Sequence, residues 1–330
     1  MLGEGKMWNP THERYENAAD VLAQHGLQPL ELAEKEGLAL INGTQFISSL
    51  TAEAVTRAES LAHTADIIAA VRGLSSAIPV ASAVLMPLVA LERVRATQQV
   101  TMEALRARPE PFEARVHDAR GQRGQKAVAA RLRDILHSAA HPSQIFTTFQ
   151  HSVQDAYSVR CVPQVHGIVH ETVDFVKQIV SRELNAATDN PMVFEDSIIS
   201  AGNFHGEYPA KCADFLAIGI SELATISERR IERLINQHLS GPNPPAGGGD
   251  KLKLPPFLVK EPGLNSGFMI MHCTAAALVV ENRTLVHPTS CDNISTSAAQ
   301  EDHVSMGAYV VASLPCAVPH CSWRWPPRHR

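Results

Sequence analysis

We predict an all-α fold, a bundle of long helices, from three features of this 330-residue sequence. Apolar residues recur at helical spacing in several long runs. Strand-like stretches are few and short, and no turn between alternating apolar residues predicts a β-hairpin. Polar residues gather between the helical runs, as they do in bundles whose functional groups lie on or beside loops.

Composition supports a globular chain and excludes several classes of partner. The sequence is 45% hydrophobic and 19% charged, which is enough apolar material for a substantial core. The net charge of −5 gives no reason to expect nucleic acid or a membrane surface. The N-terminus has no apolar core of a secretory signal, and the six cysteines form no C-x-x-C pair. We therefore expect reduced thiols and a cytoplasmic protein.

The helices are expected in chain order as follows. Ser48 or Ser49 would cap a helix through residues 51–71. A second helix would run from about Ile168 to Leu184, where valines step by three and four and an ATDNP turn follows. Residues 213–234 read as a long amphipathic helix with its charges outside. Residues 266–280 are apolar on nearly every side, which predicts a helix buried on all faces.

Two uncharged or flexible stretches interrupt this pattern. Residues 73–91 carry no charge and are long enough for a membrane span, but Pro79 and Pro87 argue against one. Residues 241–256 are expected to form a flexible loop, and their glycines lack the G-K-S/T ending of a phosphate loop, so we expect no nucleotide. Residues 315–330 read as an irregular tail.

Two pairs of histidines have the spacing of metal ligands on a helix. They are His137 with His141, and His166 with His170. Neither pair has further ligands at matching spacing, so we expect ordinary polar histidines and no metal. The basic run at residues 115–134 lacks interleaved aromatics and reads as a solvated, ion-paired face.

Four polar stretches in apolar surroundings are candidate site segments, because buried polar groups need partners. They lie around Asn42, around Gln154 to Arg160, around Phe204 and around Glu301. Gln154, Tyr157 and Arg160 are three apart and would share one helical face. A guanidinium there suits a carboxylate ligand. The alternative is a buried polar network that fixes helix packing.

Several ordered motifs resemble the histidine ammonia-lyases of the aromatic amino acid ammonia-lyase family. They are EGLALINGTQ, VQDAYSVRCVPQVHG, ELNAATDNPMVF, GNFHGEYPAK, ISERRIERL, GLNSGFMIMHCTAAALVVEN and STSAAQEDHVSMG. The resemblance implies the fold of the fumarase and ammonia-lyase superfamily and a homotetramer. It also implies that L-histidine is eliminated to urocanate and ammonia, and QEDH is the motif of the histidine-type enzymes.

The resemblance also implies roles for single residues. Arg160 would hold the substrate carboxylate, and Glu301 would face the imidazole. The residues around the amino group and the family's electrophile, a methylidene-imidazolone formed from Ala-Ser-Gly, would be Asn42, Gln154 and Tyr157, with Asn190 as a weaker candidate. Phe204 would pack against substrate or prosthetic group. By this resemblance the catalytic residues would be Tyr157 and Glu301, with the Glu301 carboxylate forming a hydrogen bond or accepting a proton.

The sequence departs from the family in three places. Ala-Ser-Gly does not occur in the 330 residues. Residues 72–100 read as an insertion into a helical domain spanning 1–314, and the family's C-terminal helices are replaced by the tail. Because of these departures, we expect this chain alone to have no ammonia-lyase activity. The alternatives are a non-catalytic homologue that serves as a binding or assembly subunit, including in a hetero-assembly with a full-length paralogue, or a misassembled gene fragment.

Overall fold

The structure is a computed structural model that describes residues 2–70, 102, 104–136, 154–240 and 254–317. The chain divides into two compact units. The smaller unit comprises Met1–Thr44 and Ala187–His205, and the larger comprises Gln45–Ala186 and Gly206–Arg330. Among the described residues, no helix is long and apolar enough to cross a lipid bilayer.

The smaller unit contains short elements only. They are the strands β1 (Lys6–Asn9), β2 (Arg14–Asn17), β3 (Met192–Val193) and β4 (Ile198–Ile199) and the helices α1 (Ala18–Gln24) and α2 (Glu36–Asn42). The strands form two antiparallel hairpins, β1 with β2 and β3 with β4. The expectation that the chain has no hairpin is therefore wrong. Trp8 stacks edge-on against Tyr15 across the first hairpin at 5.4 Å, a cross-strand pairing that apolar alternation does not reveal.

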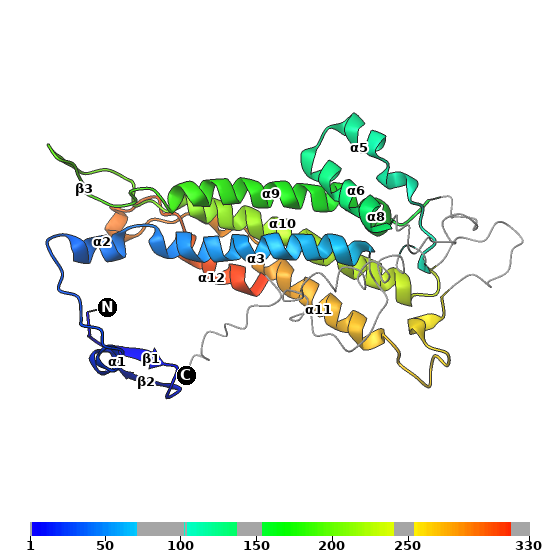
Figure 1. Ribbon diagram of the computed structural model, residues 1–330, viewed down its shortest axis with the longest axis horizontal. Helices are drawn as coiled ribbons and strands as arrows, with labels where there is room; N and C mark the ends of the chain where they lie inside the picture. The colour runs from blue at the N-terminus through cyan, green and yellow to red at the C-terminus, as the bar shows by residue number, and fades with distance from the viewer. Residues whose placement is uncertain (1, 71–101, 103, 137–153, 241–253, 318–330) are drawn as a thin grey trace, which may run out of the picture. The chain divides into compact units, whose positions relative to one another are not determined.

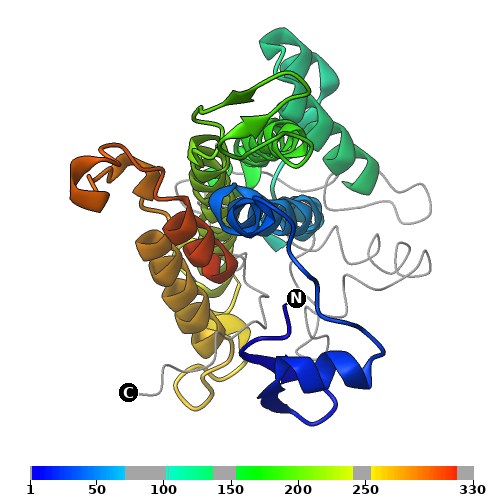
Figure 2. The ribbon, with the colours of Figure 1, turned by 90° about the vertical axis from the view of Figure 1, so that its left-hand side faces the viewer.

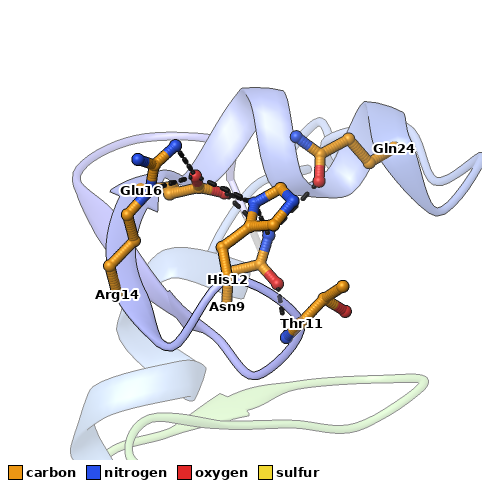
Figure 3. A network of polar contacts seen from close by, with 6 residues as sticks. All are labelled: Asn9, Thr11, His12, Arg14, Glu16 and Gln24. Carbon is orange, nitrogen blue, oxygen red and sulfur yellow. Dashed lines mark hydrogen bonds and ion pairs between the residues drawn. The ribbon is translucent and has the colours of Figure 1, made fainter.

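A polar network joins the first hairpin to α1 (Figure 3). Asn9 is buried, and its Nδ2 donates to Glu16 Oε2 at 2.7 Å and to Gln24 Oε1 at 3.2 Å. Hydrogen bonds from His12, then Arg14 and Asn9, lower the pKa of Glu16 to about 2. Glu16 is therefore ionised at neutral pH and accepts from three side chains of the hairpin.

The larger unit is a helical bundle, which confirms the all-α expectation. Its α-helices are α3 (Gln45–Ala70), α5 (Ala114–Arg120), α6 (Arg123–Leu136), α8 (Tyr157–Arg160), α9 (Val162–Glu183), α10 (Glu207–Ile235), α11 (Met269–Leu285) and α12 (Gly307–Ala317). The short 3-10 turns are η2 (Glu110–Phe112), η3 (Pro256–Leu258), η4 (Thr289–Cys291) and η5 (Ser297–Ala299). Helices α3, α9 and α10 run side by side in both views, and α6 packs on α9 (Figures 1 and 2).

Small residues allow the central helices to pack closely. Helix α3 buries alanines at steps of three and four residues, namely Ala54, Ala58, Ala62, Ala65 and Ala69. Helix α9 faces them with a stripe of valines, namely Val169, Val173, Val176 and Val180. β-branched valines are stiff, so these positions form a well-defined surface against the alanine face. The core thus follows directly from the apolar period of the sequence.

Helices α6 and α9 touch at a pair of glycines, Gly124 and Gly167. A Cβ at Gly124 would lie 2.1 Å from the carbonyl oxygen of Gly167, and a Cβ at Gly167 would lie 2.4 Å from the backbone nitrogen of Gln125. Real Cβ atoms do not approach backbone this closely, and backbone cannot swing aside as a side chain can. The contact therefore requires that both residues lack a side chain.

The structure corrects four details of the expected elements. Helix α3 begins at Gln45, so Ser48 and Ser49 lie inside it. Helix α9 begins at Val162, six residues before the expected start. Helix α11 is not buried on all faces, since of its residues only Val279 and Asn282 are buried. Residues 315–317 belong to α12, where Val310 and Val311 pack into the core, so the irregular tail cannot begin at 315.

Several expected features lie outside the described residues. They are the candidate insertion at 72–100, with the uncharged stretch 73–91, as well as His137, His141, residues 241–253 and residues 318–330.

Gly167→Ala is expected to destabilise the protein by about 1–3 kcal/mol, because the added methyl group overpacks a backbone contact. Gly219→Ala in α10 is the control, since its Cβ would meet only the Thr172 side chain at 3.5 Å, an ordinary contact. That control is expected to be neutral or slightly stabilising. Denaturant unfolding of both variants measures the difference, and equal stabilities would contradict the close-contact explanation.

Candidate functional site

The short helix α8 presents two of the candidate residues to solvent. Its Val159 is buried in the core, whereas Tyr157 is 66% exposed and Arg160 is also exposed. Gln154 lies in a bend before the helix begins, so the expectation that it shares a helical face with Tyr157 and Arg160 is wrong. Helix and bend nevertheless keep the three residues on one short segment.

Two buried charged groups hold this segment in place. Asp155 is buried, and its Oδ2 accepts a hydrogen bond from the backbone nitrogen of Arg108 at 3.0 Å. Arg230 of α10 is fully buried, and its Nη1 donates to the carbonyl oxygen of Ser158 at 3.0 Å. A charge-assisted hydrogen bond in a desolvated setting is strong, so α8 is tied firmly to the bundle.

Arg160 opens onto a cavity of about 410 Å³. The cavity is lined by Arg108, Glu110, Pro111, Val116, Asp155, Arg160, Cys161 and Gln164. Burial raises the pKa of the Cys161 thiol, although Arg160 opposes the shift, so the thiol stays protonated at neutral pH. Among the described residues, no acidic side chain forms an ion pair with Arg160. Its guanidinium is available to a carboxylate from outside the chain.

In the smaller unit, Asn42 and Asn190 lie together. Asn42 ends α2, and its Nδ2 donates to the backbone oxygen of Asn190 and to Asp189 Oδ1, both at 3.2 Å. The side chain of Asn190 is engaged in its own turn, where Oδ1 accepts from the backbone nitrogen of Ala201 at 2.7 Å. Asn190 therefore stabilises the loop that Asn42 contacts. The contacts of Asn42 described here use its Nδ2, and its amide oxygen takes part in none of them.

Phe204 and Glu301 lie on loops. Phe204 belongs to the smaller unit and is 40% exposed, beside Asn203, whose Nδ2 donates to the carbonyl oxygen of Ala187 at 3.1 Å. Glu301 of the larger unit is exposed, and its Oε2 accepts from the hydroxyl of Thr296 at 2.8 Å. Within the described residues, no hydrogen bond or ion pair joins Glu301 to Tyr157 or Arg160.

Of the two histidine pairs with metal-ligand spacing, the pair His166 and His170 contacts a buried carboxylate that the sequence does not single out. Asp66 of α3 is fully buried, and it lies 2.7 Å from His166 Nδ1 and 2.9 Å from His170 Nε2. His63, Asp66 and His170 bring possible ligand atoms within 4.8 Å of one another. The guanidinium of Arg131 already lies between them, 2.6 Å from Asp66 Oδ2 and 2.9 Å from His170 Nε2.

The protonation states in this cluster follow from burial and hydrogen bonding. Burial alone would raise the pKa of Asp66, but hydrogen bonds from His166 and His170 outweigh it and hold the pKa well below its usual value. Burial lowers the pKa of His166 despite Asp66, so His166 is neutral and donates through Nδ1. Asp66 is thus an ionised acceptor that Arg131 neutralises.

Asp66→Asn is expected to reduce the free energy of unfolding at pH 7 by about 3–5 kcal/mol, because it removes the charge that pairs with Arg131 and replaces one buried acceptor oxygen by a donor. Asp118→Asn, which breaks the exposed ion pair with Lys126, is expected to change it by less than about 0.5 kcal/mol.

The pH dependence of the Asp66 effect has a definite sign. Because the folded-state pKa of Asp66 is depressed, its contribution is present above the unfolded pKa of about 3.9 and is lost as pH falls further. Urea titrations at several pH values should show the two proteins converging only in acid. Convergence near neutral pH would contradict the assignment.

The chain shares its sequence and fold with known proteins. The family profile described as "Aromatic amino acid lyase" matches residues 1–76 and 73–322. A histidine ammonia-lyase of Bos taurus is 50% identical over 324 residues, which is 97% of this chain and 43% of that protein. A histidine ammonia-lyase of Bacillus mycoides is 43% identical over 309 residues, covering 93% of this chain and 52% of that protein. The chain thus spans about half the length of the curated relatives it matches.

A solved structure shows the same fold. The crystal structure of histidine ammonia-lyase from Trypanosoma cruzi superposes with a TM-score of 0.75 at 48% identity, covering 96% of this chain and 52% of that one. The helical bundle described above is therefore the one found in that enzyme.

Proposed function

The chain belongs to the aromatic amino acid lyase family, and from that premise we propose that it is part of an enzyme that eliminates ammonia from L-histidine to give urocanate. The observation that carries the proposal is the position of Arg160. Its guanidinium lines an open cavity and has no acidic partner among the described residues. A cation held ready in this way suits an amino acid carboxylate, which a guanidinium binds through two parallel hydrogen bonds.

Glu301 is proposed to bind the imidazole ring of the substrate through a hydrogen bond. Its carboxylate is exposed and already accepts one hydrogen bond, from Thr296, which leaves further acceptor capacity. An ionised carboxylate orients an imidazole through its N–H and stabilises the imidazolium form. Phe204, 40% exposed, would supply an apolar surface for the ring or the prosthetic group.

Asn42, Gln154 and Tyr157 are the side chains proposed to surround the family's prosthetic group. They offer two amides and a phenol, a donor and acceptor set that fits a small polar heterocycle. When bound, the methylidene-imidazolone supplies the electrophile that makes the amine a good leaving group. Its parent tripeptide, Ala-Ser-Gly, does not occur in these 330 residues, so this chain is assigned only the surrounding residues. Tyr157 is 66% exposed, so its phenol can form a hydrogen bond there.

The proposal includes a homo-oligomer, the tetramer that the family resemblance implies. Helix α11 supports it, because five of its apolar side chains are each at least 37% exposed, namely Met269, Ile270, Met271, Leu278 and Val280. Contiguous apolar side chains of this kind are covered in stable proteins. The reduced cysteines expected from the sequence favour a cytoplasmic location.

The direct test is to incubate the purified complete protein with L-histidine and measure both products. Equimolar urocanate and ammonia are expected, with L-phenylalanine and L-tyrosine poorer substrates. Absence of urocanate, or a clear preference for another amino acid, would contradict the proposal.

Arg160→Met is expected to raise KM for L-histidine by about 10–100-fold, since a hydrogen bond to a charged group contributes about 1.5–3 kcal/mol. Arg115→Met is the control, because Arg115 is 84% exposed and, within the described part of the chain, forms an ion pair only with Glu113. Steady-state kinetics would show an unchanged KM for that variant. An Arg160 variant with the KM of the wild type would remove the proposed carboxylate site.

A further inference from the structure

The turn at residues 188–191 holds both ends of helix α2. Lys35 immediately precedes the helix in a left-handed conformation, with φ of 69°, and Asn42 is its last residue. Lys35 Nζ lies 2.6 Å from Asp189 Oδ2 and also donates to the carbonyl oxygen of Pro191. Asn42 Nδ2 donates to Asp189 Oδ1 and to the carbonyl oxygen of Asn190. A single turn, more than a hundred residues away in sequence, therefore fixes the helix at both ends.

Asp189 is the centre of this arrangement. Its Oδ2 faces Lys35, while its Oδ1 accepts from Asn42 and, at 2.7 Å, from the backbone nitrogen of Asn190. The hydrogen bond from Lys35, followed by that from the Asn190 backbone, lowers the pKa of Asp189. The carboxylate is therefore ionised at neutral pH and acts only as an acceptor.

An acceptor at this position determines which way the amide of Asn42 faces. Both contacts made by Nδ2 are to oxygen atoms, so the reverse orientation would set the amide oxygen against a carboxylate and a carbonyl. Both hydrogens of the amide are used in these contacts. The amide oxygen of Asn42 therefore faces away from Asp189 and can accept a hydrogen bond from a ligand.

We propose that Asp189, held by Lys35, is a positioning residue that fixes the Asn42 amide so that its oxygen accepts a hydrogen bond from the amino group of the substrate. The inference rests on the proposed function, and the family resemblance implies that Asn42 lies near that amino group as well as the prosthetic group. Asp189 and Lys35 act through Asn42 and need not touch the substrate. If the pair served only to hold α2, its loss would change stability but would not be coupled to Asn42 in catalysis.

A double-mutant cycle in the complete protein separates these roles. Asn42→Ala and Asp189→Ala are each expected to lower kcat for L-histidine by about 10–100-fold, with KM changed by less than about threefold. The double variant is expected to be no slower than Asn42→Ala, because the two residues act as one unit. Additive losses, or a kcat of Asp189→Ala equal to that of the wild type, would overturn the proposal.

Variants of Lys35 test whether the charge pair is needed. Lys35→Met is expected to lower kcat and Lys35→Arg to restore most of it, since a guanidinium keeps the charge and the donors. Glu36→Gln is the matched control on the same helix, because Glu36 accepts only from the nearby backbone nitrogen of Ala33 in these contacts. If Asp189→Ala does not fold, Asp189→Asn, which keeps the shape and removes the charge, takes its place in the cycle. A Lys35→Arg variant as slow as Lys35→Met would count against the proposal.

The orientation of the Asn42 amide can be measured by crystallography whether or not the protein acts on histidine. If the wild-type protein released no ammonia from histidine, the proposed function would fail whatever the variants did. Crystal structures of the wild type and Asp189→Ala, at a resolution that distinguishes the amide oxygen from the nitrogen, would then decide the positioning role. A rotated Asn42 amide in the variant would support it, and an unchanged amide would refute it.

Discussion

A fully buried carboxylate, that of Asp66, joins helix α3 to α6 and α9. Taking an unpartnered charge out of water is costly, so Asp66 can be buried only where Arg131 and two histidines converge on it. That requirement helps to set the register of the three helices along their axes, and the close glycine contact between α6 and α9 restricts it further. The bundle thus combines closely packed apolar contacts with one buried polar contact that has a single satisfactory arrangement.

The bundle matters for function because it carries α8. Val159 anchors this short helix in the core, and the buried guanidinium of Arg230 binds the carbonyl oxygen of Ser158. Tyr157 and Arg160 can therefore point outward from a firmly held backbone. The smaller unit uses the same principle at Asp189, where one ionised carboxylate determines the orientation of the Asn42 amide. In the larger unit the charge of Arg230 holds the backbone of α8, which carries Tyr157 and Arg160. In the smaller unit the charge of Asp189 holds the Asn42 amide.

Much of the fold could be predicted from the sequence, because α3, α9 and α10 bury apolar stripes whose period is visible in the residues themselves. The exposure of α11 could not, since an apolar run does not show whether its own chain covers it. The hairpin of β1 and β2 was missed because Trp8 and Tyr15 pair across strands with a polar network beside them. The sequence names Asn42, Tyr157, Arg160 and Glu301 as candidate site residues, and these roles stay predictions, but the side chains that support them could not be predicted. Asp66 lies 100 residues from His166, and Lys35 lies 154 residues from Asp189, so local spacing carries no sign of either pair.

The most direct test of the roles proposed for Arg160 and Glu301 is a crystal structure of the complete protein with bound L-histidine or a non-reacting analogue. The substrate carboxylate is expected to form two hydrogen bonds with the Arg160 guanidinium, and the imidazole is expected to form a hydrogen bond with Glu301. A carboxylate bound elsewhere, with Arg160 still facing an empty cavity, would contradict this expectation.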